Sequence, residues 1–306
     1  MFSPPLLSVE KELLAPQGLV AVSLILVRYA ELGLKSRPVR RRFEQVLVAK
    51  MMAALARAGV EALVKQEQGR VFIETNDREK AMRALIRVFG IASLSPVVKV
   101  PSDMESMGRA AAEISRPLLG KGQSFAVKAR RVGDHSYTSM DVGREVGSAV
   151  FLANEEKGPR VDLTHPDVVF YVEVRGKLAY VFSEYVPGPG GLPLGTQGRA
   201  LALVEKNRDA LAAWLIMKRG CRVIAVAREE NEAIHILRDW DPELKVVAPG
   251  EWVDLAKQNR ALAVVFGFTV DDAEKIKRLA LPVPAFFPLI GMNDEEIGKR
   301  LKGIEG

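Results

Sequence analysis

The first hundred residues combine short apolar runs with one long amphipathic segment. The run 22–28 is apolar and rich in β-forming residues, which predicts a strand. After Pro38, apolar residues recur at helical spacing as far as Gly59, which predicts a helix that ends at this glycine. Pro96 indicates an edge position for the strand that contains it, because proline lacks a backbone donor. The remaining predicted elements are strands at 62–66, 70–74 and 91–100 and a helix at 78–88. Their order, β-α-β-β-α-β, is that of a ferredoxin-like unit.

A second unit mixes helices and strands in a different order. Its predicted elements are a helix at 104–118, a strand at 124–130, a helix at 139–154 and a hairpin of strands at 168–174 and 178–184. The hairpin follows from two β-rich runs joined by a short turn around Gly176. On the helix at 139–154, the side that we expect to be buried carries Val142, Val146, Ala149, Val150 and Leu152.

From residue 200 onward, continuous apolar runs alternate with amphipathic segments. Strands are predicted at 200–204, 222–227, 244–247 and 262–266, and helices at 208–219, 230–237, 251–258 and 271–279. Such alternation is typical of a Rossmann-like parallel sheet covered on both faces. A stretch rich in glycine and proline, Gly188 to Gly198, leads into this unit. We therefore expect a fold of the α/β and α+β multidomain class, with an extension at 1–20 and domains at 21–100, 101–187 and 188–306.

Composition excludes several classes of protein. The chain has 306 residues, of which 48% are hydrophobic and 27% charged, as is ordinary for a globular protein. The single cysteine, Cys221, cannot form an intrachain disulfide, and the three histidines show no ligand spacing, so we expect no metal site. No apolar run reaches the roughly 20 residues of a membrane helix, and the first 20 residues do not resemble a secretory signal. We expect a cytoplasmic protein that does not bind membranes.

Charge is concentrated in one part of the chain. Residues 21–99 hold 15 Lys and Arg against 7 Asp and Glu, a net charge of +8, whereas residues 100–187 carry −1 and residues 188–306 carry zero. A domain with such an excess is typical of a surface that binds a polyanion. The alternative is that these charges only solvate helix faces.

Three separated segments resemble one known family. The first, RYAELGLKSRPVRRRFE followed by VFGIASLSPV, resembles the N-terminal ferredoxin-like domain of the tRNA 4-thiouridine synthetase family. The second, FAVKARRVGDHSYTSMDVGREVGSAVF with VDLTHPDVVFYVEVRGKLAYVF, is similar to a THUMP domain. The third, GPGGLPLGTQG and later PAFFPLIGMNDEEI, is similar to the start and end of that family's pyrophosphatase-loop domain. The match runs in order over roughly residues 22–304.

The resemblance implies that the first two domains and the third domain have different functions. In this family the first two domains together bind tRNA near its acceptor 3′ end. The third domain adenylates a uridine with ATP, and a cysteine persulfide then delivers sulfur. The family's arrangement also implies a homodimer that spans one tRNA between two protomers.

Basic side chains in the first two domains are candidates for contacts to RNA phosphates. They are Lys35, Arg37, Arg40, Arg41 and Arg42 around the start of the first helix, and Lys128, Arg130 and Arg131 in the second domain. A basic first turn opposes the helix dipole, which favours a use for these arginines over simple solvation. Because a strand alternates its faces, Lys128 and Arg130 can share one side. Tyr137 is a candidate for stacking on an unpaired base, or else a packed residue.

The nucleotide loop of the family does not match this chain. Its pattern is Ser-Gly-Gly-X-Asp-Ser, in which glycines let the backbone approach the pyrophosphate. The aligned positions here are Val204, Glu205, Lys206, Asn207, Arg208 and Asp209. A shift of one residue brings Asp209 to the position of the Asp, but the glycines are still absent. Glu205 also adds like charge, and Lys206 alone is a poor substitute for a phosphate loop.

The cysteine that sulfur transfer would require is not matched either. A persulfide carrier is an accessible, activated thiol, whereas Cys221 precedes an apolar strand and is expected to be buried. The chain ends soon after LIGMNDEEI, so we expect no later catalytic region. We therefore expect no catalytic residue and no cofactor, in a tRNA-binding protein that docks on, chaperones or regulates tRNA, or that partners an active tRNA-modifying enzyme. One alternative is an active sulfurtransferase with a divergent loop. Another is an interaction module that does not bind RNA, and the net charge of +8 on residues 21–99 argues against it.

Overall fold

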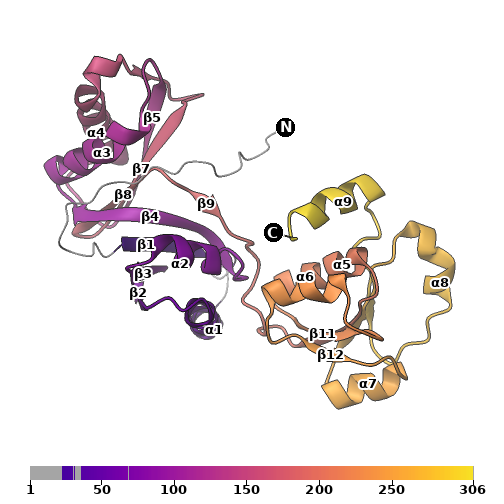
Figure 1. The fold of residues 1–306 in the computed structure, drawn as a ribbon. Helices are drawn as coiled ribbons and strands as arrows, with labels where there is room; N and C mark the ends of the chain where they lie inside the picture. Colours follow the sequence, from indigo (N-terminus) through magenta and orange to yellow (C-terminus); the bar gives the residue numbers. More distant parts are fainter. Residues whose placement is uncertain (1–22, 30, 32–35, 68, 306) are drawn as a thin grey trace.

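The computed structural model describes residues 23–29, 31, 36–67 and 69–305 (Figure 1). The extension expected at 1–20 lies outside these residues. The first unit consists of β1 (Ser23–Tyr29), α1 (Arg37–Arg57), β2 (Ala62–Glu67), β3 (Arg70–Thr75), α2 (Arg78–Leu85) and β4 (Ile91–Pro101). This order is the one predicted. Helix α2 ends three residues earlier than expected, and α1 buries Phe43, Leu47, Met51 and Leu55 at a spacing of four.

Strand β4 is central, so the edge position expected from Pro96 is wrong. One edge of β4 pairs antiparallel with β1 along 91–97. The other edge pairs with β9 (Val186–Pro187) at Ser93 and Leu94, and with β8 from Val98 onward. Pro96 falls between these two partners, where that edge has no pairing. The gap in the ladder allows a proline inside a central strand.

The second unit continues the same sheet. It contains α3 (Met104–Leu118), β5 (Ser124–Val132), α4 (Ser139–Ala153), β6 (Arg160–Val161), β7 (Val168–Arg175) and β8 (Leu178–Phe182). Helix α4 begins at a capping box of Thr138 and Asp141. Its buried stripe holds Val142, Val146 and Val150, but Leu152 is 68% exposed, so its expected burial is wrong. Position 152 is only two residues beyond Val150, which turns it away from the stripe.

The first two units share one nine-stranded sheet, in the order β2-β3-β1-β4-β8-β7-β5-β6, with β9 beside β4. Helices α1 and α2 pack on the face that carries Ile25 and Val27, and α3 and α4 pack on the face that carries Val172 and Val174. Residues that alternate with these along the strands, such as Leu26 and Phe182, point to the other face of the sheet. There they form a separate apolar cluster made of strand residues. We call the face with this cluster the open face. In Figure 1 the two helix pairs lie on the outside of the curved sheet.

The third unit is a five-stranded parallel sheet in the order β12-β11-β10-β13-β14. Its elements are β10 (Arg199–Leu203), α5 (Asn207–Lys218), β11 (Arg222–Val226), α6 (Glu232–Trp240), β12 (Lys245–Val247), α7 (Trp252–Asn259), β13 (Ala263–Val265), α8 (Ala273–Lys277), β14 (Ala285–Phe286) and α9 (Asp294–Lys302). The predicted parallel sheet is confirmed. The helix expected at 271–279 is shorter, because residues 270–272 form a 3-10 turn, and β14 was not predicted. None of the helices in the described part of the chain is long and apolar enough to cross a bilayer.

An aromatic side chain of the first unit completes the core of the third. Phe89, which follows α2, is 2% exposed and belongs to the apolar cluster of the third unit. Its ring centroid lies 5.5 Å from that of Trp214 and 5.2 Å from that of Trp240. The two units are therefore packed together through a shared core, which is stronger than surface contact alone.

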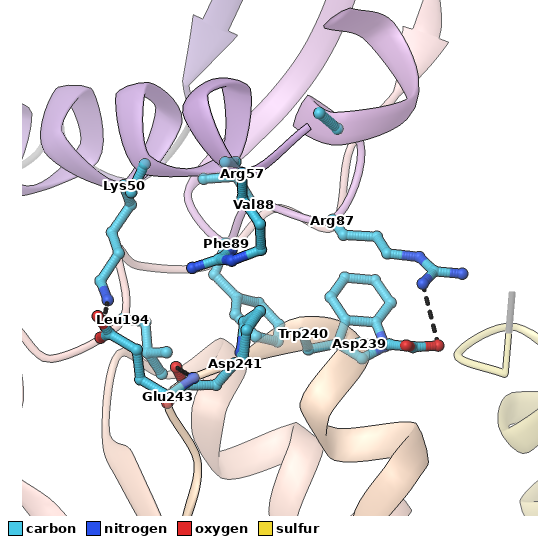
Figure 2. Close-up of a pocket in the computed structure, with 14 residues that line it drawn as sticks. Lys50, Arg57, Arg87, Val88, Phe89, Leu194, Asp239, Trp240, Asp241 and Glu243 are labelled. Carbon is cyan, nitrogen blue, oxygen red and sulfur yellow. Dashed lines mark hydrogen bonds and ion pairs between the residues drawn. The ribbon is translucent and has the colours of Figure 1, made fainter. Parts of the chain in front are cut away.

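Ion pairs surround this shared core (Figure 2). Lys50 of α1 lies 3.3 Å from Glu243, and Arg87 lies 3.0 Å from Asp239 at the end of α6. Exposed pairs of this kind contribute at most about 1 kcal/mol each, so we assign most of the contact energy to Phe89.

The glycine-rich lead-in threads closely between the two units. Gly191 has φ +73°, and a Cβ at this position would collide with the carbonyl of Lys218. A Cβ on Gly188 would likewise collide with the carbonyl of Ile91. Gly190 also has a positive φ, +67°, but a Cβ there would meet nothing within 4 Å. Gly188 and Gly191 therefore permit a close backbone approach, whereas Gly190 only permits a left-handed backbone conformation.

One buried carboxylate joins the first unit to the second. Glu173 of β7 is 4% exposed, and it accepts from Arg28 Nε of β1 at 3.2 Å and from Arg70 Nε of β3 at 3.1 Å. Arg175, two residues further along β7, lies 2.6 Å away. Burial raises the pKa of Glu173, but Arg70, Arg175 and Arg28 outweigh it, so the pKa lies below its usual range. We call these four residues the arginine–glutamate joint.

We predict that Gly191→Ala destabilises the third unit far more than Gly190→Ala. Gly190→Ala costs only the left-handed backbone penalty of about 1–2 kcal/mol, whereas Gly191→Ala adds a collision with Lys218. All three tryptophans lie in the third unit, so tryptophan fluorescence during urea unfolding measures this difference. Equal midpoints for the two variants would contradict the packing role of Gly191.

We predict that Glu173→Gln lowers the free energy of unfolding by about 3–5 kcal/mol at pH 7, since it leaves buried guanidinium groups without their anion. The folded-state pKa of Glu173 is depressed, so its stabilising contribution is present at neutral pH and is lost as the pH falls below about 4. The gap between wild type and variant should therefore narrow in acid. The exposed Glu184→Gln is the matched control, and a gap independent of pH would contradict the role of charge at the joint.

Candidate nucleic-acid interface and nucleotide loop

The start of α1 presents cations to solvent. Arg37, Arg41 and Arg42 are exposed and Arg40 is half-buried, while Lys35 lies outside the described residues. The helix begins at Arg37, so the other three arginines extend from the end of its first turn into its second. The first turn holds no acidic residue, and the side chain of Ser36 makes no capping bond. The positive end of the helix dipole therefore adds to the side-chain charge.

The second set of basic residues lies on β5. Lys128 and Arg130 are exposed on the open face, where their strand partners on β7 are Tyr171 and Glu173. Arg131 points to the opposite face and donates to the carbonyl of Gly133 at 3.1 Å. The arginines of α1 belong to the helix-covered side of the first unit. The structure therefore presents two separate basic surfaces, one on α1 and one on β5.

Tyr137 is held within the second unit. It is half-buried against the core under α3 and α4, and its hydroxyl donates to the carbonyl of Ser102. Its ring centroid lies 5.3 Å from that of His135. This placement favours the packed interpretation of Tyr137 over a stacking role.

Sequence reasoning missed the arginine–glutamate joint. Arg28, Arg70 and Arg175 gather on one face of the sheet beside the Lys128 and Arg130 surface. A signal was present in the sequence VFYVEVR, where Glu173 and Arg175 alternate with apolar residues that a buried strand would carry. Such inward-facing charges require buried partners. Their partners come from residues more than 100 positions away, which periodicity does not reveal.

The candidate nucleotide loop follows β10, at the carboxyl edge of the parallel sheet. Val204 is buried, Glu205 and Lys206 are exposed, and Asn207 and Arg208 are half-buried. Asn207 donates to Glu232 at 3.0 Å, and Arg208 pairs with Asp272 at 3.0 Å. The two half-buried polar residues of the loop, Asn207 and Arg208, therefore already have side-chain partners.

Asp209 occupies the place where the loop could hold an anion. It is buried in the first turn of α5, and its Oδ2 accepts from the backbone amides of Glu205 at 3.1 Å and Lys206 at 2.9 Å. Burial raises the pKa of Asp209, although the two amide hydrogen bonds act in the opposite direction. Backbone amides before a helix N-terminus are the groups that cradle phosphate in nucleotide loops. Here the carboxylate of Asp209 holds them.

At the topological switch point beside this loop, the chain after β13 packs tightly on α5. The strand order reverses between β10 and β13, which is where open α/β sheets bind ligands. Gly267, just after β13, packs so closely on Asp209 that a Cβ there would lie 2.9 Å from the Asp209 Cα. A cavity of about 80 Å³ lies instead between the first and third units, beside Phe89 and Trp240 (Figure 2). That volume is well below the ~300 Å³ of small-molecule sites.

Cys221 does not have the features of a sulfur carrier. It is half-buried, so its expected full burial is not observed, and its Sγ lies 3.9 Å from the carbonyl of Gln197. Burial raises the pKa of the thiol, which lowers the fraction of nucleophilic thiolate. Among the described residues, no three His, Cys, Asp or Glu side chains are grouped so that they could hold a metal ion.

Two family models match the chain. The ThiI ferredoxin-like domain matches residues 24–95, and the THUMP domain matches residues 101–184. These ranges correspond to the first and second units. The fold expected from the resemblance is therefore confirmed for both.

Curated relatives carry the name "Probable tRNA sulfurtransferase". The one from Methanosarcina acetivorans is 43% identical over 72% of this chain and 57% of its own length. The one from Methanothermobacter thermautotrophicus is 30% identical over 92% of this chain and 84% of its own length. The chain spans just over half the length of several of these relatives, including 51% for Methanosarcina mazei.

Solved structures share the whole fold. A protein from Pyrococcus horikoshii superposes with a TM-score of 0.77 and 28% identity, over 92% of this chain and 99% of its own. A 4-thiouridine synthetase, solved in complex with RNA and ATP, superposes with a TM-score of 0.73 and 23% identity, over 92% of this chain and 85% of its own. The second likeness shows the fold alone. Together with the Methanothermobacter relative and the two family models, these matches show that the chain belongs to the tRNA sulfurtransferase family.

Proposed function

We propose that this protein binds tRNA at its acceptor 3′ end through its ferredoxin-like and THUMP domains, and that it neither adenylates nor thiolates RNA itself. The observation that carries the proposal is the carboxylate of Asp209, which occupies the loop amides while the cations of the first two domains stay exposed. The names of the relatives and the RNA-bound 4-thiouridine synthetase support tRNA as the ligand. Cytoplasmic localisation remains a prediction.

The first two domains present the exposed cations that RNA binding requires. Phosphate contacts supply most of the affinity for nucleic acid, and exposed arginines and lysines make them. Arg37, Arg41 and Arg42 on α1 and Lys128 and Arg130 on β5 are exposed. An RNA that contacts both surfaces must reach from the outer helix α1 to the open face of the sheet. The joint links β1 and β3, in the unit that carries α1, to β7 beside Lys128 and Arg130.

The third domain keeps the parallel α/β fold of the family but not the residues for nucleotide binding and sulfur delivery. Phosphate binding at its loop would require displacement of the buried Asp209 carboxylate from two amides and separation of the packed Asp209 and Gly267. Both steps oppose binding. Cys221, with its raised pKa, offers no activated thiol for sulfur delivery. We therefore assign this domain a supporting role, in which it braces the first unit through Phe89.

The second candidate function is an active tRNA sulfurtransferase with a divergent nucleotide loop. The observation in its favour is the Methanothermobacter relative, which aligns over 92% of this chain under that name. A homodimer that spans one tRNA, or a complex with an active tRNA-modifying enzyme, is compatible with either candidate. Thiolation of tRNA by the purified protein with ATP and a sulfur donor would favour the second candidate.

We predict that the double charge reversal Arg41→Glu, Arg42→Glu weakens tRNA binding by at least about tenfold at low salt. It should also reduce the slope of log affinity against log salt by about one for each lost phosphate contact. A filter-binding series at several salt concentrations measures both quantities. The matched control is Lys257→Glu, Arg278→Glu, which reverses two exposed charges in the third domain. Equal losses in both variants would contradict a specific role for α1.

We predict that calorimetric titration with ATP and Mg²⁺ shows no binding at micromolar concentrations, because the loop amides are already satisfied. Asp209→Ala should lower the free energy of unfolding by about 1 kcal/mol, because the amides of Glu205 and Lys206 lose the carboxylate that caps them. Micromolar ATP affinity of the wild-type protein would overturn the proposed loss of adenylation. Retained stability in Asp209→Ala would contradict the described cap.

A further inference from the structure

We propose that Tyr185 and Arg28 form a stacking site for one unpaired RNA base on the open face, with Lys128 and Arg130 placed for the neighbouring phosphates. This inference rests on the proposed function, since it names where in the first two domains a single-stranded segment is held. It replaces Tyr137, whose hydroxyl and ring are engaged within the second unit.

Tyr185 offers an accessible ring beside a buried cation. It is 50% exposed and lies between β8 and β9, directly at the junction of the first two units. The guanidinium carbon of Arg28 lies 5.0 Å from the centroid of the Tyr185 ring and 4.7 Å from that of Phe182. Arg28 therefore supports the Tyr185 ring from the protein side and leaves its outer surface to solvent.

The supporting cation is fixed in place. Arg28 is 8% exposed, and it donates to Glu173 at 3.2 Å and to Ser95 at 2.9 Å. Its Nη2 is buried without a hydrogen-bond partner among the described residues. A stacking platform that is already ordered loses little side-chain entropy when a ligand binds.

Aromatic rings connect Tyr185 to the exposed cations. The centroid of Tyr171 lies 6.0 Å from that of Tyr185, and Tyr171 stacks on Phe182 at 5.1 Å. Lys128 is the strand partner of Tyr171, one strand spacing of about 4.8 Å away. Arg130 follows on the same face, next to Glu173. A base on Tyr185 thus has positive charge within reach of its flanking phosphates.

This arrangement fits a single strand better than a duplex. A base in a duplex is covered on both faces, whereas an unpaired base can stack on an aromatic side chain while cations hold its backbone. The open face offers one accessible ring and a line of cations, which is the combination found in single-strand binding sites. A duplex would use only the cations.

The test compares two RNA hairpins that share one stem, the first with a four-nucleotide unpaired 3′ overhang and the second with a blunt end. Tyr185→Ala should weaken binding of the overhang hairpin by about tenfold and leave the blunt hairpin within about twofold. Tyr185→Phe keeps the ring and should bind the overhang hairpin as the wild type does. Phe151→Ala removes another exposed aromatic ring, on α4, and serves as the control.

The outcomes separate the two proposals. If the wild-type protein binds neither hairpin nor tRNA, the proposed function fails. If it binds both hairpins and Tyr185→Ala changes neither affinity, or weakens both equally, the stacking site is overturned while RNA binding stands. A 2-aminopurine in the overhang gives an independent readout, since stacking on Tyr185 should change its fluorescence with wild type and Tyr185→Phe but not with Tyr185→Ala. Thermal unfolding of each variant verifies that it is folded.

Discussion

A single buried carboxylate links strands from the two halves of the nine-stranded sheet. Glu173 satisfies guanidinium groups from β1, β3 and its own strand, so strands from both units depend on one side chain. Three guanidinium groups lie around one carboxylate in a place with little water, which a protein tolerates only where hydrogen bonds are good. The joint ties β1 and β3 of the first unit to β7, whose neighbour β5 carries Lys128 and Arg130.

Much of the fold could be predicted from the sequence, because it depends on local periodicity. The α1 stripe from Phe43 to Leu55 and the parallel strands of the third unit follow from spacing alone. The edge position predicted from Pro96 was wrong, because this proline lies in an unpaired gap between β9 and β8. That gap exists only in the assembled sheet and cannot be read from the local sequence. The 3-10 turn at 270–272 and the strand at Ala285 likewise depend on neighbours that no local pattern specifies.

The candidate sites were less predictable, because they combine residues that are distant in the chain. Sequence alone showed that the loop from Val204 to Asp209 lacks glycines, but not that Asp209 turns back onto the amides before it. It also led to Tyr137 as the stacking aromatic, since exposure cannot be read from a motif. Tyr185 became a candidate only when the fold brought it to Arg28, 157 positions earlier in the chain. Contacts of this kind are decided by topology.

The cap formed by Asp209 has a thermodynamic consequence for the third domain. A domain that binds a separate anion gains stability in proportion to the logarithm of ligand concentration, and its conformation responds to supply. A carboxylate on the same chain has no concentration to vary, so its contribution is constant. If the third domain binds no nucleotide, as we propose, its stability does not depend on the concentration of ATP. For a domain that we propose to brace an RNA-binding surface, this would keep its contribution to that surface constant when the ATP concentration changes.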